Sequence, residues 1–170
     1  MLNMVRIIID SCSVILLSKA SVLEKVSEQH DASVTEEVFH EVMAGKEKKF
    51  LDALLLERLF KEKKIGKSHI KNKKLMGKLE EDFGLGEGEA STLALAIETN
   101  QIIMTDNKQG RKTAKTYGLK LSGSPEAIVS LFKAKKISEN KAIEALKILR
   151  EFGWFNDYII EKSMKEIKND

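Results

Sequence analysis

The sequence predicts an α/β domain in which a short, mostly parallel central sheet lies between two layers of helices, a three-layer α/β/α arrangement. Short apolar runs typical of strands alternate with helix-type periodicity along all 170 residues. Right-handed crossovers between parallel strands place helices on both faces of such a sheet. No linker or repeat divides the chain, so we expect one domain over residues 1–170, with helices at about 138–168 packed as an extension.

The first quarter of the chain contains a strand, two short helices, a second strand and a longer helix. We expect these elements at residues 4–9, 14–20, 21–28, 31–34 and 36–44. The first strand is the β-branched run MVRIII, and the second is a short run after Asp31. The longer helix has Thr35 as its N-cap and ends at Gly45, and its Val38 and Val42 lie four residues apart on one face.

The middle of the chain is expected to be helical apart from one irregular segment. Helices are predicted at residues 47–61, 75–83 and 87–99, and the irregular segment at 63–72. The helix at 87–99 is the clearest, because four apolar residues from Ala90 to Ile97 fall at the spacings i, i+3, i+4 and i+7. Gly84 and Gly86 end the helix before it.

The last third returns to alternation. Strands are predicted at residues 101–105 and 119–121, and helices at 108–117, 125–135, 138–151 and 156–167. The run QIIMT is typical of a buried strand, and Gly118 stops the helix that follows it. Pro125 suits the first helical position after Ser124.

Composition excludes several classes of protein. The chain is 42% hydrophobic and 32% charged with a single Pro, which excludes collagen-like and disordered sequences. The single Cys, Cys12, excludes a disulfide framework and a cysteine-rich zinc site, and we interpret it as a small buried hydrophobe. No apolar run approaches the roughly 18 residues of a membrane span, and the start does not match a secretory signal. We therefore expect a cytoplasmic protein without membrane contacts.

An aspartate ends each of two apolar strands, Asp10 after the first and Asp106 after the run QIIMT. Ligands of open α/β sheets bind outside the carboxyl ends of the strands. If the two strands are neighbours, the carboxylates face each other and repel unless a proton or a cation lies between them. Each aspartate alone could simply cap the next helix, but the pair at equivalent strand ends favours a metal site.

Two helices offer further carboxylates. Glu89 borders the apolar face of its helix while Glu87 is expected to face solvent, and interaction with the helix dipole is the alternative role for Glu89. Glu37 and Glu41 share one face at a spacing of four residues, and geometry alone does not choose between them. Carboxylates without a His or Cys cluster indicate a hard, oxygen-liganded cation, Mg²⁺ or Mn²⁺.

The segment from Lys61 to Lys78 holds eight lysines against one acid, Glu62. Such a segment is either a solvated surface or a patch that contacts phosphates, and the two interpretations stay open at this point.

Four motifs in this order resemble a PIN domain, the nuclease fold of the VapC-type toxins and related ribonucleases: IIIDSCSVILLSKA, VTEEVFHEV, GLGEGEASTLALA and IIMTDNKQGRKTAKTYGLKLSGS. The resemblance covers nearly the whole chain. It implies a metal-dependent ribonuclease, a hydrolase that cleaves single-stranded or structured RNA with Mg²⁺ or Mn²⁺ and leaves a 5′-phosphate and a 3′-hydroxyl.

The resemblance also implies roles for particular residues. The catalytic and metal-binding carboxylates are Asp10, Glu41, Glu89 and Asp106. Glu41 rather than Glu37 matches the acidic position of the family pattern. Side chains expected beside the metal are Ser11, Thr105 and Asn107. Residues expected to contact RNA are Lys71, Lys73, Lys74, Arg111 and Lys112.

The sequence departs from the family pattern at two positions. Thr35 stands where such proteins often have Pro, and Asn107 stands where many relatives carry an Asp, which leaves one carboxylate fewer for a second metal. The alternative function is therefore a catalytically weak PIN-fold module that binds RNA or a partner protein. Among partners, the resemblance implies RNA and, for the toxins, a small antitoxin protein; a homodimer stays open. A dehalogenase-type phosphatase ranks last, because Cys12 stands where its second Asp is required.

Overall fold

The computed structural model describes residues 4–46 and 50–170 and contains one five-stranded sheet. The strands are β1 (Arg6–Ile9), β2 (Asp31–Thr35), β3 (Ile65–Ser68), β4 (Ile102–Met104) and β5 (Leu121–Ser122). Their order across the sheet is β3-β2-β1-β4-β5. Each of the four neighbouring pairs is parallel, so the predicted α/β class is confirmed and the sheet is parallel throughout rather than in most of its pairs.

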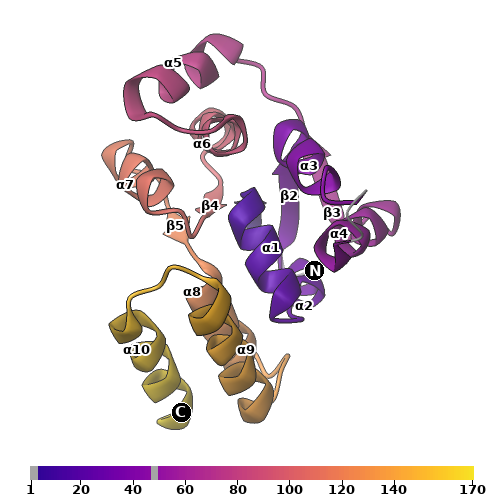
Figure 1. Cartoon of the computed structure of the whole chain (residues 1–170), viewed down its shortest axis with the longest axis vertical. Helices are drawn as coiled ribbons and strands as arrows, with labels where there is room; N and C mark the ends of the chain where they lie inside the picture. Colours follow the sequence, from indigo (N-terminus) through magenta and orange to yellow (C-terminus); the bar gives the residue numbers. More distant parts are fainter. Residues whose placement is uncertain (1–3, 47–49) are drawn as a thin grey trace.

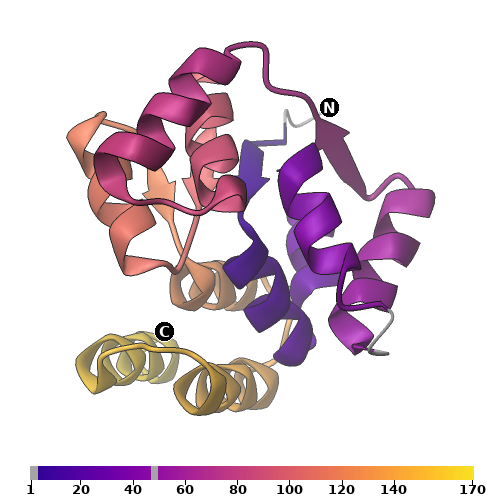
Figure 2. The same ribbon diagram turned by 45° about the horizontal axis from the view of Figure 1, so that its top comes forward.

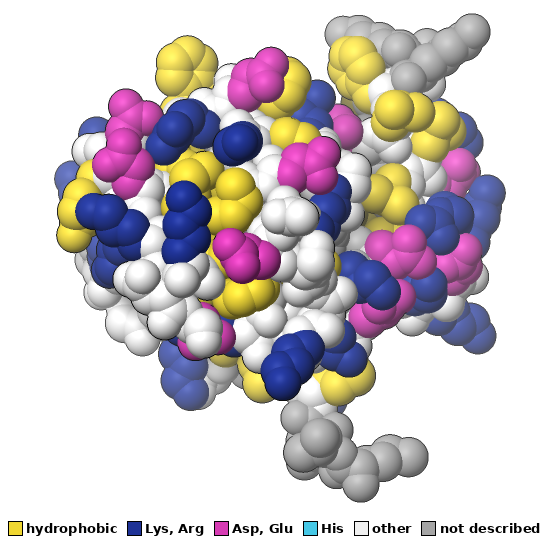
Figure 3. All heavy atoms as spheres, turned by 90° about the horizontal axis from the view of Figure 1, so that it is seen from below, with side chains coloured by type: hydrophobic (Ala, Val, Ile, Leu, Met, Phe, Trp, Pro, Cys, Tyr) yellow, Lys and Arg dark blue, Asp and Glu magenta, His cyan; other side chains and the backbone are white. Residues whose placement is uncertain are grey.

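Helices cover the sheet on both sides. They are α1 (Ser11–Lys19), α2 (Leu23–Gln29), α3 (Glu36–Met43), α4 (Leu51–Lys61), α5 (Lys73–Phe83), α6 (Glu87–Thr99), α7 (Lys108–Thr116), α8 (Ser124–Lys133), α9 (Glu139–Phe152) and α10 (Asp157–Lys168). Figures 1 and 2 show α5 and α6 at one end of the molecule and α9 and α10 at the other. Seen from the α9–α10 end, the surface mixes charged and hydrophobic side chains (Figure 3).

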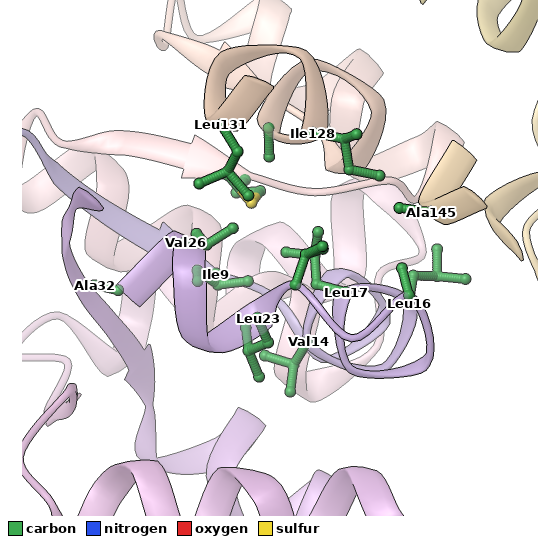
Figure 4. Close-up of a cluster of buried hydrophobic side chains, with 14 of the residues drawn as sticks. Ile9, Val14, Leu16, Leu17, Leu23, Val26, Ala32, Ile128, Leu131 and Ala145 are labelled. Atoms are coloured by element: carbon green, nitrogen blue, oxygen red, sulfur yellow. The ribbon is translucent and has the colours of Figure 1, made fainter. Parts of the chain in front are cut away.

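The two faces of β1 enter two separate cores, because successive side chains of a strand point to opposite faces. Ile7 and Ile9 are buried in the larger core, together with side chains from α1, α2, α8, α9 and α10. Figure 4 shows part of it, with Ile9 among side chains of α1, α2 and α8. Ile8 lies in the smaller core, against Leu93 and the other buried residues of α6 and α5. This split produces the predicted three layers.

Several element predictions were wrong in detail, and the first helix begins at Ser11 rather than at residue 14. The segment 63–72 was expected to be irregular, but it contains β3, which pairs with β2 through residues 65–68. This edge strand has a single buried side chain, Ile65, and therefore lacks an apolar run. The last strand lies at Leu121–Ser122 rather than at 119–121. The helix expected over 47–61 is described from Leu51, and its predicted first residues, 47–49, lie outside the described residues.

The strand order places a topological switch point between β1 and β4. From β1 the sheet continues through β2 to β3 on one side and through β4 to β5 on the other. Ile9 is in register with Met104, and the backbone N–H of Asp10 donates to the carbonyl of Met104 at 3.0 Å. Crevices of this kind, at the carboxyl ends of diverging strands, are where open α/β sheets bind ligands. None of the helices described is long and apolar enough to cross a membrane.

Candidate functional site

Asp10 lies at the carboxyl end of β1 and is the N-cap of α1. Its side chain is almost completely buried, at 1% exposure. Oδ1 accepts from the backbone N–H of Ser13 at 2.8 Å, and Oδ2 accepts from the hydroxyl of Thr105 at the end of β4. The capping role left open by the sequence is therefore present, and the same carboxylate also joins β1 to β4.

Asp106 follows β4 and contacts two other helices. Its Oδ2 accepts from the hydroxyl of Ser13 at 2.8 Å and from the hydroxyl of Ser124, and its Oδ1 accepts from the backbone N–H of Ser124 at 2.7 Å. Ser124 was expected to precede the helix that Pro125 opens, but it is the first residue of α8. Gly123 is the N-cap and has no side chain, so Asp106 supplies the acceptor that a capping residue normally provides.

Burial raises the pKa of both aspartates. The pKa of Asp10 rises from 3.8 to about 7, mainly because burial penalises the charged form; the charge of Asp106 adds to the rise, while the hydrogen bonds from Thr105 and Ser13 oppose it. The pKa of Asp106 is also raised, mainly by burial. Burial, together with the charges of Asp10 and Asp106, raises the pKa of Cys12 as well, so its thiol stays neutral.

Glu41 extends from α3 toward the start of α6. Its Oε1 accepts from the hydroxyl of Ser11 at 3.0 Å, directly beside Asp10 in the chain. A Cβ placed on Gly88 would lie 2.2 Å from Oε2 of Glu41, so only glycine leaves room for this carboxylate. Glu41 and Gly88 line a pocket of about 640 Å³ together with Glu37 and neighbouring residues of both helices.

Glu37 and Glu41 have different surroundings although they share one helix face. Glu37 forms an ion pair with Lys73, and its Oε2 is buried without a hydrogen-bond partner in the structure. Glu41 forms no ion pair among the described residues. Of the four carboxylates that line the pocket, Glu36 and Glu37 form ion pairs with lysines, whereas Glu41 and Glu87 form none among the described residues.

Glu89 turns back toward the start of its own helix. Its Oε2 accepts from the backbone N–H of Gly86 at 3.2 Å in a capping-box arrangement. The interaction with the helix start that the sequence left open is therefore present. Its negative charge also raises the pKa of Cys12, which places Glu89 within electrostatic range of the residues that follow β1. Glu87 is exposed, as expected.

The structure brings the predicted carboxylates together in part. Asp10 and Asp106 share Ser13, and Glu41 bonds Ser11 next to Asp10. The side chains do not converge on a common point: within residues 4–46 and 50–170, no three His, Cys, Asp or Glu side chains form a group that could hold a metal ion. The reason is that each carboxylate is oriented by a protein donor, Ser13 and Thr105 for Asp10 and the backbone of Gly86 for Glu89.

The donor set nevertheless fits a hard divalent cation. None of Asp10, Glu41, Glu89 and Asp106 forms an ion pair with a Lys, Arg or His of the described chain, whereas Glu37 beside them does. All available ligand atoms are carboxylate and hydroxyl oxygens, the type that Mg²⁺ and Mn²⁺ prefer. A cation would favour the charged form of Asp10 and so oppose the burial that, with a smaller contribution from the charge of Asp106, raises its pKa.

The other residues singled out from the sequence have varied positions. Thr105 bonds Asp10, as described, whereas Asn107 caps α7 by accepting from the backbone N–H of Gly110 at 2.8 Å. Arg111 donates to the carbonyls of Thr105 and Ser122 and pairs with Glu126, so it holds β4, β5 and α8 together. Three of the five residues predicted to contact RNA are exposed and form no ion pair among the described residues. They are Lys71, Lys74 and Lys112.

Sequence reasoning missed three residues that shape the site: Ser13, Gly88 and Ser124. Ser13 lies three residues after the N-cap Asp10, inside the first turn of α1. At this position the sequence indicates only a helix residue and not a hydroxyl that contacts another strand end. Gly88 is the second residue of α6, and a glycine directly after the helix start in a run that otherwise favours a helix was the available signal. Ser124 gave no signal, because its contact with Asp106 depends on how β4 and β5 pair.

Comparison with known proteins agrees with this geometry. A family model described as a PIN domain matches residues 6–169, almost the entire chain. Among curated proteins, no match was found.

Proposed function

The chain belongs to the PIN-domain family, a nuclease fold, and from this we propose that it is a divalent-metal-dependent endoribonuclease whose active site is the crevice between β1 and β4. PIN domains typically use divalent metals. The finer elements of the proposal are the choice of RNA as substrate, Mg²⁺ or Mn²⁺ as the ion, and Asp10, Glu41, Glu89 and Asp106 as its ligands.

One observation carries the proposal: the buried Asp10 and the half-buried Asp106 meet at the switch point of the sheet and have no cationic partner in the described chain. Carboxylates buried for structural reasons are normally paired or replaced by neutral groups, because burying an uncompensated charge is costly. Here Ser13 orients both carboxylates instead, and neither has an ion-pair partner among the described residues. Such a cost is typical of a site that binds a cation.

The residues of the chain would divide the work of hydrolysis. Asp10 and Asp106, with Glu41 and Glu89, would hold the ion, which when bound supplies charge stabilisation at the scissile phosphate and promotes ionisation of the attacking water. Ser13 and Thr105 fix the orientation of the aspartates by donating to them. Removing a supporting donor of this kind typically lowers metal affinity or activity by 10- to 100-fold.

The substrate in this proposal is single-stranded RNA or a loop. A carboxylate crevice would repel phosphates unless cations nearby attract the backbone. Lys112 is exposed and lines a groove together with Asp106, and the exposed Lys74 follows Lys73, the ion-pair partner of Glu37. A role as the toxin of a toxin–antitoxin pair is part of the same proposal. Growth arrest on expression, absent for Asp10→Asn, would support that role.

The experiment is cleavage of an end-labelled single-stranded RNA with Mn²⁺ or Mg²⁺ and with EDTA. We expect cleavage only with the metal, product ends that are 5′-phosphate and 3′-hydroxyl, and loss of cleavage in both Asp10→Asn and Asp106→Asn. Asp82→Asn, an exposed carboxylate-to-amide change on α5, is the matched control. RNA binding without any metal-dependent cleavage would favour the alternative, a binding module.

A further inference from the structure

Helix α7 carries a basic stripe outside the carboxylate site. Lys108, Lys112 and Lys115 are exposed and lie at i, i+4 and i+7, so they share one face of the helix. No ion pair of the described chain involves any of the three. Like charges at this spacing destabilise a helix unless an anion lies beside them. Arg111 holds the helix in place through two backbone carbonyls of neighbouring strand ends.

The link between α9 and α10 presents a tryptophan to solvent. Trp154 is fully exposed, at 105%, although tryptophan is among the residues that gain most from burial. Its neighbour Phe155 packs against the larger core. A Cβ on Gly153 would lie 2.3 Å from the ring of Phe155, so Gly153 makes room for that ring. Phe155 thus anchors the link in the core while Trp154 next to it points outward.

The basic stripe and Trp154 belong to a single groove. The groove has a volume of about 920 Å³ and is lined by α7, by the start of α8 and by the α9–α10 link, and it includes Asp106. Figures 1 and 2 show α7 and the α9–α10 pair on the same side of the molecule. The lining of the groove therefore includes the candidate catalytic Asp106, the three lysines of α7 and the ring of Trp154, together with Glu126.

We propose that this groove binds the stretch of single-stranded RNA that flanks the scissile bond, with its phosphates on Lys108, Lys112 and Lys115 and one base stacked on Trp154. This inference rests on the proposed function, because it uses the continuity of the groove with Asp106. Unpaired lysines match a polyanion, and an exposed aromatic ring matches an unstacked base, a combination typical of single-strand binding surfaces. A duplex keeps its bases stacked and would use only the lysines.

The test uses the intrinsic fluorescence of Trp154, the only tryptophan in the chain. A single-stranded oligoribonucleotide of about 12 nucleotides is titrated into the wild type in EDTA, which prevents cleavage. We expect saturable quenching, because a stacked base quenches indole emission, and little quenching with a duplex of equal length. Binding of the single strand, seen by anisotropy of a labelled RNA, without quenching of Trp154 would overturn the inference.

Variants separate stacking from charge. By anisotropy, Trp154→Ala should weaken binding roughly 5- to 150-fold and Trp154→Phe should restore most of it, because Phe also stacks. The double variant Lys112→Ala/Lys115→Ala should lower the slope of log affinity against log salt by about 0.7 for each phosphate that is no longer neutralised. The control is Lys136→Ala/Lys147→Ala, which removes two exposed lysines outside the groove and should leave the slope unchanged. Equal effects of the two double variants would contradict a groove-specific role.

A parallel assay of Mn²⁺-dependent cleavage distinguishes failure of this inference from failure of the proposed function. Cleavage without quenching contradicts the groove and leaves the nuclease proposal intact. Quenching without cleavage supports the groove and contradicts the nuclease. Quenching by polyglutamate but not by RNA would assign the groove to an acidic protein partner and overturn the inference.

Discussion

Asp10 and Asp106 accept hydrogen bonds from the same residue, Ser13. Its backbone N–H donates to Asp10 Oδ1 and its hydroxyl donates to Asp106 Oδ2, each at 2.8 Å. The first turn of α1 therefore sets the position of one carboxylate relative to the other. Ser13 therefore links the two acids, through its backbone to Asp10 and through its hydroxyl to Asp106.

Ser13→Ala tests this coupling. The backbone bond to Asp10 survives, but Asp106 loses a donor, and we expect the free energy of unfolding to fall by about 1 kcal/mol. Cleavage and Mn²⁺ affinity should fall by about 10- to 100-fold, because Asp106 is less well oriented. The control is Ser18→Ala on the same helix, whose hydroxyl bonds only the carbonyl of Val14. Equal cleavage by the two variants would show that the shared serine has no role in the site.

Gly88→Ala tests the position of Glu41. The added Cβ would lie 2.2 Å from Glu41 Oε2, so the carboxylate must move away from α6 while the backbone stays in place. We expect a folded protein with cleavage reduced at least about tenfold, as for removal of an orienting group. Gly77→Ala in α5 is the control, because its Cβ would meet nothing within 4 Å, and it should be stabilised by about 0.5–1 kcal/mol. Full activity of Gly88→Ala would argue against Glu41 as a ligand.

The raised pKa of Asp10 predicts a pH dependence of stability without metal. Below about pH 4 this group is protonated in both states; between 3.8 and about 7 the unfolded chain releases a proton that the folded chain retains. The free energy of unfolding should therefore fall as pH rises through this window, by at most about 4 kcal/mol from Asp10. Urea unfolding in EDTA at several pH values measures it.

Asp10→Asn isolates that contribution, because Asn also caps a helix. The variant should gain stability relative to wild type as pH rises from about 4 to 7, and Asp82→Asn, which is exposed, should not. If the free energy of unfolding depends on pH in the same way for the wild type and Asp10→Asn, burial of the Asp10 carboxylate does not lower stability as pH rises.

The lysine-rich segment gives a prediction about salt. Lys71 and Lys74 are exposed, whereas Lys73 is held by Glu37. The double variant Lys71→Ala/Lys74→Ala should therefore lower the slope of log affinity for RNA against log salt by about 0.7 for each phosphate left without its lysine. Adding Lys73→Ala to this variant should lower the slope by a smaller amount than the loss of Lys71 or of Lys74 does. A slope unchanged in the double variant would identify the segment as solvated surface.

The strand pattern allowed much of the site to be predicted. β1 and β4 were recognisable because each is a β-branched or apolar run that ends in an acid, and their adjacency places Asp10 and Asp106 at one edge. β3 was missed because a four-residue edge strand with one buried residue has no periodicity to detect.

The direction in which each side chain points could not be predicted from the sequence. Helical spacing placed Glu89 beside the apolar face, but whether its carboxylate turns to a metal or to the N–H of Gly86 depends on rotamers and local donors. The cap of α8 shows the same limit, since the acceptor for Ser124 comes from Asp106, a residue on another element that only the folded sheet brings near.

The most direct test of the account is thermal unfolding near pH 7.5 with and without Mn²⁺. An ion that binds only the folded state adds about 2.7 kcal/mol at a hundredfold excess over Kd, or about 5–10 °C in Tm for a chain of this size. We predict such a rise for the wild type, a much smaller one for Asp10→Asn and Asp106→Asn, and an unchanged rise for Asp82→Asn. If millimolar Mn²⁺ leaves the Tm of the wild type unmoved, the two aspartates are helix caps and strand ties, and the crevice between β1 and β4 is not a metal site.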